Sequence, residues 1–276
     1  MIVQHNMTAL NANRQLGITN TNLARSTEKL SSGYRVNRAA DDAAGLSISE
    51  KMRGQIRGLE QASTNAEDGQ SLIQTAEGAL SEIHSVLQRM RELTVQASND
   101  TNVSADRKAI AKEVRALTSE INRIATQTQF NTMGLLSGGF KNKKLQVGAN
   151  TNQIISITIS SMTASKLGVS ATAIAKVISS STGKEITKLI TTVNTAITKV
   201  STQRSALGAL QNRLDHTIAN ADNMAENLQS SESKIRDVDM ADEMVSYSAS
   251  SILQQAGQSM LAQANQATQG VLSLLQ

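Results

Sequence analysis

The sequence predicts a mainly α-helical protein, an antiparallel coiled-coil rod of long helices with a small β-hairpin region in the middle of the chain. Three observations predict this. The 276 residues include no proline, where about fourteen would be expected at average usage, so no proline interrupts a long helix. Aromatic residues make up only 1% of the chain, too few to anchor a compact enzyme core. Apolar residues recur at three-, four- and seven-residue steps, the spacing of a coiled-coil seam.

In the N-terminal segment, residues 1–44, the recurring apolar stripe has one residue per heptad. Asparagine and threonine fill most of the positions between them. Because so thin a stripe cannot fold alone, we expect this segment to be disordered in the monomer until a partner helix covers it. The predicted N-terminal assembly seam consists of Ile2, Ala9, Leu16, Leu23 and Leu30.

Two strongly patterned helices are expected next. Over residues 45–98 the apolar positions alternate three and four apart, which predicts a coiled-coil helix. The polar stretch from Ser98 to Ser104 predicts a turn, with Ser104 as the N-cap of the following helix and Asp106 in its first turn. That second helix carries the apolar stripe Ile110, Val114, Leu117, Ile121 and Ile124.

Residues 127–182 have a different character. Glycines punctuate the segment, and residues 155–159 alternate between isoleucine and a hydroxyl residue, which is typical of a strand. Residues 144–147 and 154–159 are therefore predicted to form a β-hairpin across residues 148–153. The remainder is rich in serine and threonine and is expected to be a short cap on the rod.

The C-terminal part returns to a helical period over residues 186–228 and ends in a weaker stripe that is nearly uncharged from Ser246 onward. The predicted C-terminal assembly seam consists of Leu253, Ala256, Met260, Ala264, Val271 and Leu275. Each end of the chain is thus a weak helix joined to a stronger one. We expect the ends, 1–44 and 236–276, to pair with each other, and the strong helices to pair within a rod domain, 45–235. Terminal stripes left partly uncovered predict self-assembly.

Other functional classes find little support. The net charge of +4 is spread among interspersed acidic and basic residues, and four aromatic residues cannot stack nucleic-acid bases. No apolar run is long enough to span a membrane, and the N-terminus lacks the pattern of a cleaved secretory signal. We find no catalytic constellation, metal motif or cofactor motif, and therefore expect no enzyme activity and no cofactor. The glycines of Gly54-x-x-x-Gly58 leave open the close approach of a neighbouring helix.

Several sequence blocks near both ends resemble bacterial flagellins. In the N-terminal half these are residues 6–12 (NMTALNA), 28–35 (EKLSSGYR), 41–46 (DDAAGL), 88–93 (QRMREL) and 127–131 (QTQFN). In the C-terminal half they are residues 207–214, 235–241 (IRDVDMA) and 260–266 (MLAQANQ). The resemblance covers about residues 1–135 and 186–276, with the blocks in the expected order. The middle of the chain is short and leaves no room for large outer domains.

The resemblance implies a structural subunit that polymerises into the flagellar filament and serves motility, with the terminal helices as the inner core. It further implies export, unfolded and without a cleaved signal peptide, to an extracellular location in the flagellum. The implied partners are other copies of the chain, a secretion chaperone at the C-terminal helix, and the filament cap and hook-associated proteins. The flagellin-sensing Toll-like receptor is a further implied partner, with Arg89, Leu93 and Glu113 as its contacts by motif match. A hook–filament junction protein or a helical adaptor protein is the alternative.

Overall fold

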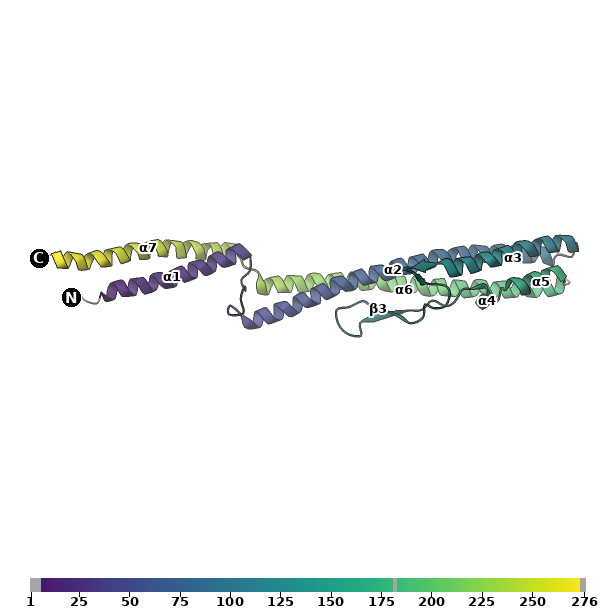
Figure 1. The fold of residues 1–276 in the computed structure, drawn as a ribbon, viewed down its shortest axis with the longest axis horizontal. Helices are drawn as coiled ribbons and strands as arrows, with labels where there is room; N and C mark the ends of the chain where they lie inside the picture. The colour runs from purple at the N-terminus through teal and green to yellow at the C-terminus, as the bar shows by residue number, and fades with distance from the viewer. Residues whose placement is uncertain (1–5, 181–182, 274–276) are drawn as a thin grey trace. The chain divides into compact units, whose positions relative to one another are not determined.

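A computed structural model describes residues 6–180 and 183–273 (Figure 1). The chain divides into two compact units, which we call the terminal unit (Met1–Ile56 with Glu226–Gln276) and the central unit (Arg57–Ala225). Long helices dominate both, as predicted. The division falls inside two helices, α2 (Ala43–Ser98) and α6 (Gly183–Arg236), so each of them contributes to both units.

The predicted seam of α2 supplies many of the buried side chains of the central core. From Leu59 to Ala97 the seam positions alternate three and four residues apart without a break and are all buried, so one face of the helix is continuously covered. Thr94 is the one hydroxyl residue among them, and its Oγ1 donates to the carbonyl of Met90 at 2.7 Å. The seam positions are Leu59, Ala62, Ala66, Gly69, Ile73, Ala76, Leu80, Ile83, Leu87, Met90, Thr94 and Ala97, and Leu72 and Leu93 are buried beside them.

Helix α6 runs antiparallel to α2 in the central unit. Gln70 Nε2 donates to Asp215 Oδ1 at 2.9 Å, and Ser63 Oγ donates to Asp222 Oδ1 at 2.9 Å. The buried residues of α6 include a strict seven-residue series, which favours a left-handed supercoil. That series is Ile186, Val193, Val200, Leu207, Leu214 and Ala221.

A tight turn joins α2 to α3 (Ser104–Gln127), as predicted. The predicted cap is wrong by one residue, because Val103 is the N-cap and Ser104 is already helical. The carboxylate of Asp106, in the first turn as expected, accepts from the Val103 N–H at 3.2 Å. Asp106 thereby satisfies the N–H of Val103 at the start of the helix. The hydroxyl of Ser104 is not needed for this role.

The middle of the chain contains the predicted hairpin, formed by β3 (Lys143–Gln146) and β4 (Ile154–Ile157). The strands are antiparallel, with Lys143 opposite Ile157 and Gln146 opposite Ile154. Ile155 and Ile157 point into the core while Ile154 and Ser156 are exposed, which fits the alternation along this strand. A smaller antiparallel pair, β1 (Gln129–Phe130) and β2 (Met133–Gly134), precedes this hairpin.

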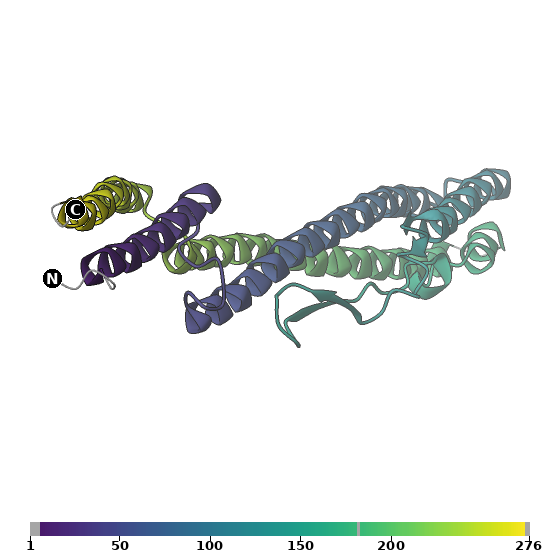
Figure 2. The same ribbon diagram turned by 60° about the vertical axis from the view of Figure 1, so that its left-hand side comes forward.

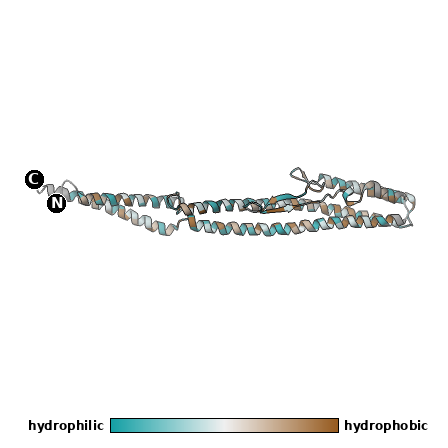
Figure 3. Ribbon diagram, turned by 90° about the horizontal axis from the view of Figure 1, so that it is seen from below, coloured by the Kyte–Doolittle hydropathy of each residue, from teal (hydrophilic) through white to brown (hydrophobic). Residues whose placement is uncertain are grey.

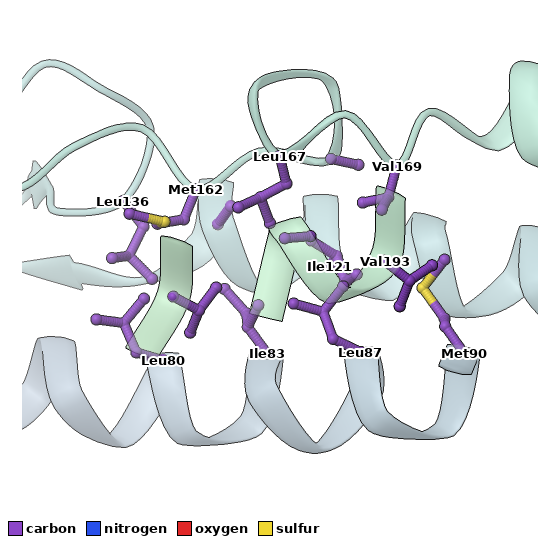
Figure 4. Packing of buried hydrophobic residues seen from close by; sticks show 14 of the residues in the cluster. Leu80, Ile83, Leu87, Met90, Ile121, Leu136, Met162, Leu167, Val169 and Val193 are labelled. Carbon is purple, nitrogen blue, oxygen red and sulfur yellow. The ribbon is translucent and has the colours of Figure 1, made fainter. Parts of the chain in front are cut away.

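Two short helices follow the hairpin, α4 (Ala164–Leu167) and α5 (Ala171–Ser180), and both pack against α3. Helix α5 is not among the helices predicted from the sequence, and its buried isoleucines, Ile174 and Ile178, lie one helical turn apart. Figure 4 shows how residues of this region close over the α2 seam, with side chains from α2, α3, α4, α6 and the connecting segments meeting in one cluster. The labelled members are Leu80, Ile83, Leu87, Met90, Ile121, Leu136, Met162, Leu167, Val169 and Val193.

The Gly54-x-x-x-Gly58 motif marks a close contact of a different kind from the helix approach that the sequence left open. A Cβ atom at Gly58 would lie 2.8 Å from the Cβ of Ala149, in the loop of the hairpin, whereas Gly54 has nothing within 4 Å. Gly69, about three turns along α2, similarly faces the side chain of Leu145. The absence of side chains at Gly58 and Gly69 therefore allows the hairpin to pack closely against α2.

Candidate functional site

Two terminal helices, α1 (Met7–Ser32) and α7 (Met240–Ser273), lie side by side and antiparallel in the terminal unit (Figure 1 and Figure 2). Polar contacts at three levels fix their register. Asn6 Nδ2 donates to the carbonyl of Ala264 at 2.9 Å, and Gln254 Nε2 donates to Asn20 Oδ1 at 2.9 Å. Near the other end, Lys29 Nζ lies 3.6 Å from Glu243 Oε2. The ends of the chain thus pair as the sequence predicts.

The face of α1 toward α7 carries the predicted N-terminal seam. Ala9, Leu16, Leu23 and Leu30 are all half-buried, and Ile2 lies outside the described residues. The positions between them on the same face are small, namely Ala12, Thr19 and Ser26. A leucine alternating with a small residue lets the partner helix come close, as a Cβ at Gly257 would lie 3.3 Å from Leu16 Cδ1.

The predicted C-terminal seam is not the face that covers α1. Leu253 and Met260 are 60% and 62% exposed, and Ala256 is exposed as well. Each of the three stands one residue before a position that faces α1, which is about 100° round the helix. Of the remaining members, Ala264 is half-buried toward α1, while the side chain of Val271 and the whole of Leu275 lie outside the described residues.

The residues of α7 that do face α1 are mostly polar or small. They are half-buried and spaced three and four apart: Glu243, Tyr247, Ser250, Gln254, Gly257, Leu261 and Ala264. Among the described side chains of the two helices, only Ser26 is buried. Little apolar surface is therefore hidden inside the pair, and the pair is weakly packed by itself.

What we call the outer apolar surface is the set of large apolar side chains that the pair leaves exposed. On α1 they are Met7, Leu10 and Ile18, and on α7 they are Met240, Met244, Val245, Ile252, Leu253 and Met260. Figure 3 shows apolar residues interspersed with polar ones along both terminal helices. The sequence has no charged residue after Glu243, so no charge accompanies most of this surface on α7. Exposed apolar residues gathered in this way mark a surface that is covered by a partner.

The three residues matched to receptor contacts do not share one exposure. Arg89 Nη2 lies 2.9 Å from Glu113 Oε1, and Arg89 Nη1 lies 3.1 Å from Glu92 Oε2, all on the surface of the central unit. Hydrogen bonds from Arg89 to these two carboxylates, first Glu113 and then Glu92, raise the pKa of the guanidinium above its usual range. Leu93, one turn on, is only 2% exposed and packs in the core. Arg89 and Glu113 are thus presented together, and the side chain of Leu93 is not.

Within residues 6–180 and 183–273 no three histidine, aspartate or glutamate side chains gather as metal ligands would. His84 is on α2 and His216 is on α6, while His5 precedes the described range. None of the helices over this range is long and apolar enough to cross a membrane.

Comparison with known proteins bears on these surfaces. Residues 3–141 match the bacterial flagellin N-terminal helical region, and residues 190–275 match the C-terminal helical region. A flagellin of Halalkalibacterium halodurans is 53% identical over 275 residues, covering all of both chains. The chain belongs to the bacterial flagellin family.

Two further proteins are similar to this chain, one in sequence and one in fold. The flagellar filament 33 kDa core protein of Treponema phagedenis is 50% identical over 285 residues, with both chains covered completely. Among solved structures, a putative flagellar hook-associated protein from Vibrio parahaemolyticus matches with a TM-score of 0.62, at 13% identity. That match covers 71% of this chain and 100% of the other, and it concerns the fold alone.

Proposed function

We propose that this flagellin polymerises into the bacterial flagellar filament by burying the outer apolar surface of α1 and α7 against other copies. The observation that carries the proposal is the exposure of Leu253, Met260 and their neighbours on a helix with no charge after Glu243. Motility and an extracellular location in the flagellum follow from this role, and it requires neither catalysis nor a cofactor.

The exposed apolar side chains contribute favourable free energy to association. Val245, Ile252, Leu253 and Met260 are between 60% and 70% exposed. Fully burying one such side chain contributes about 1.5–3 kcal/mol, so covering the exposed parts of all four contributes roughly 4–8 kcal/mol per subunit. Association and ordering oppose this gain, so assembly should depend steeply on concentration.

We also propose that α1 and α7, the helical parts of the terminal segments 1–44 and 236–276, are unfolded in the isolated subunit. The weakness of their mutual packing supports this, since Ser26 is the one buried side chain among those described in the two helices. Helices of low intrinsic stability gain most of it from tertiary packing. Contact with other copies would supply that packing through the outer apolar surface.

Membership of the flagellin family supports the remaining partners that we propose. The subunit is exported unfolded, without a cleaved signal peptide. A secretion chaperone covers the C-terminal helix beforehand, and the exposed apolar side chains of α7 are a surface in need of such a cover. Filament cap and hook-associated proteins adjoin the finished polymer.

We propose recognition by the flagellin-sensing Toll-like receptor through Arg89 on α2 and Glu113 on α3, with the buried Leu93 packing α2 in place beneath Arg89. The pairing of two exposed, opposite charges supports a polar contact site. Arg89→Ala should lower receptor signalling in a reporter cell assay. Arg123→Ala is the matched control, because Arg123 also pairs with an exposed glutamate, Glu120. Equal signalling by both variants would refute this site.

Assembly is tested by salting out the purified full-length protein and looking for filaments by negative-stain electron microscopy. Leu253→Glu should abolish filaments, whereas Gln255→Glu, which adds the same charge to an exposed position about 200° round α7, should preserve them. Failure of both variants alike would contradict a role for the apolar stripe. A wild-type chain that stays monomeric and helical would favour a hook–filament junction or helical adaptor protein instead.

A further inference from the structure

The two links that lead into the terminal helices are joined to each other. The first link, residues 33–42, connects α1 to α2, and the second, residues 237–239, connects α6 to α7. Val238 N–H donates to the carbonyl of Gly33 at 3.0 Å, and Arg35 N–H donates to the carbonyl of Arg236 at 2.6 Å. Tyr34 and Asp237 face each other as an isolated antiparallel bridge between these bonds.

The Arg236 side chain binds this junction together from three sides. Its guanidinium carbon lies 4.6 Å from the centre of the Tyr34 ring, in the first link. Its Nη1 lies 3.1 Å from Glu50 Oε1 on α2 and 3.9 Å from Glu232 Oε1 on α6. The side chain is only 15% exposed, so these contacts are partly shielded from water. The buried Ser49 hydroxyl in turn donates to Glu232 Oε1 at 3.1 Å.

A second arginine closes the end of α6. Arg35 Nη2 donates to the carbonyls of Ile235 and Lys234, at 2.7 and 3.2 Å. Carbonyls in the last turn of a helix have no partner within the helix, so the first link satisfies the end of α6. Each link is therefore completed by residues about 200 positions away in the sequence, and neither is complete without the other.

We infer that Arg236 is a positioning residue for assembly, which keeps the two links paired in the subunit so that α1 and α7 fold from a fixed start. This inference rests on the proposed function. Starting a helix is the unfavourable step of its formation, and α1 and α7 have little mutual packing to set their register. Paired links supply that start, because Gly33 ends α1 and Asp239 precedes α7 at one place.

Hydrogen exchange in the dissolved subunit tests the first half of the inference. The amides of Arg35 and Val238 should exchange slowly in the wild-type chain. In Arg236→Gln they should exchange about three- to thirtyfold faster, as expected for loss of a partly buried cation–π contact. Arg53→Gln is the matched control, because it removes an exposed arginine that also pairs with Glu50, at 3.1 Å. Unchanged exchange in Arg236→Gln would overturn the inference.

A disulfide in place of the side-chain contact tests the second half. The chain contains no cysteine, and residues opposite each other in an antiparallel bridge have the Cα spacing that a disulfide needs. Tyr34→Cys with Asp237→Cys should polymerise poorly when reduced, because the ring under Arg236 is gone. Oxidation of the same protein should return the critical concentration to the wild-type value.

Equal assembly of the oxidised and reduced forms would overturn the inference, as would wild-type assembly by Arg236→Gln. Normal melting of the central unit in every variant would show that the defect is confined to the links. Absence of filaments from the wild-type chain would defeat the proposed function instead. In that case the exchange rates of Arg35 and Val238 still decide whether Arg236 holds the links together.

Discussion

Shortening one exposed side chain of α7 should weaken polymerisation by a predictable amount. Leu253 is 60% exposed in the subunit, and burying the exposed part of a leucine contributes about 1–2 kcal/mol. Leu253→Ala forfeits most of that contribution. Since 1.4 kcal/mol is about a tenfold change in an equilibrium constant, the critical concentration for filament growth should rise roughly five- to thirtyfold.

The substitution is chosen so that other effects are small. Alanine is the best helix former, so α7 itself should fold no less readily, and the exposed Leu253 side chain leaves no cavity in the subunit. The assay is sedimentation of filaments grown from seeds over a concentration series. Gln255→Ala, an exposed polar position on the same helix, should leave the critical concentration unchanged. An unchanged value for Leu253→Ala would refute the proposal that this stripe lies between copies.

Three further perturbations test the central unit, the terminal unit and the first link in turn. Leu87 is fully buried in the central core, so Leu87→Ala should cost about 2–5 kcal/mol and lower the melting temperature followed by circular dichroism. Leu16→Glu should leave that transition unchanged but block filaments, because Leu16 lies against Gly257 of α7; normal filaments would contradict the pairing. The hydrogen bond that the Arg38 N–H donates to the Asp41 carboxylate lowers the pKa of Asp41. This hydrogen bond therefore stabilises the first link above the ordinary pKa of an aspartate, and that stabilisation is lost as the pH falls through the lowered pKa. An NMR titration of that carboxyl should find the lowered pKa, and a midpoint at or above the ordinary value would contradict it.

The long helices could be predicted because their buried apolar residues recur at a regular helical spacing. The three- and four-residue steps of α2 fix which face is buried whatever partner covers it, so residues such as Leu80 and Leu87 are evident from the sequence. The hairpin was equally evident, because alternation along β4 reflects one buried and one exposed face. Helix α5 is hard to predict because it is only ten residues long and lies in a serine-rich stretch. Its two buried isoleucines, Ile174 and Ile178, are too few to establish a helical period.

The terminal unit was harder to predict, for two physical reasons. The contact of α7 with α1 mixes polar and small residues such as Ser250, Gln254 and Gly257 with a few apolar ones such as Leu261, so it has no clear hydrophobic period. Small residues matter there because they allow close approach, as at Gly257. The cluster around Arg236 could not be predicted from local sequence, because its partners Tyr34 and Glu50 come from the opposite end of the chain. Only the folded backbone brings these groups together.

The two faces of α7 have a consequence for how such a protein can change over generations. One face keeps the chain's own ends together through small and polar residues, and the other, about 100° away, presents Leu253 and Met260 outward. Mutations on the outward face alter how tightly copies hold one another and leave the intramolecular pair intact. Selection can therefore retune the strength of the polymer one residue at a time, without first sacrificing the fold of the subunit that builds it.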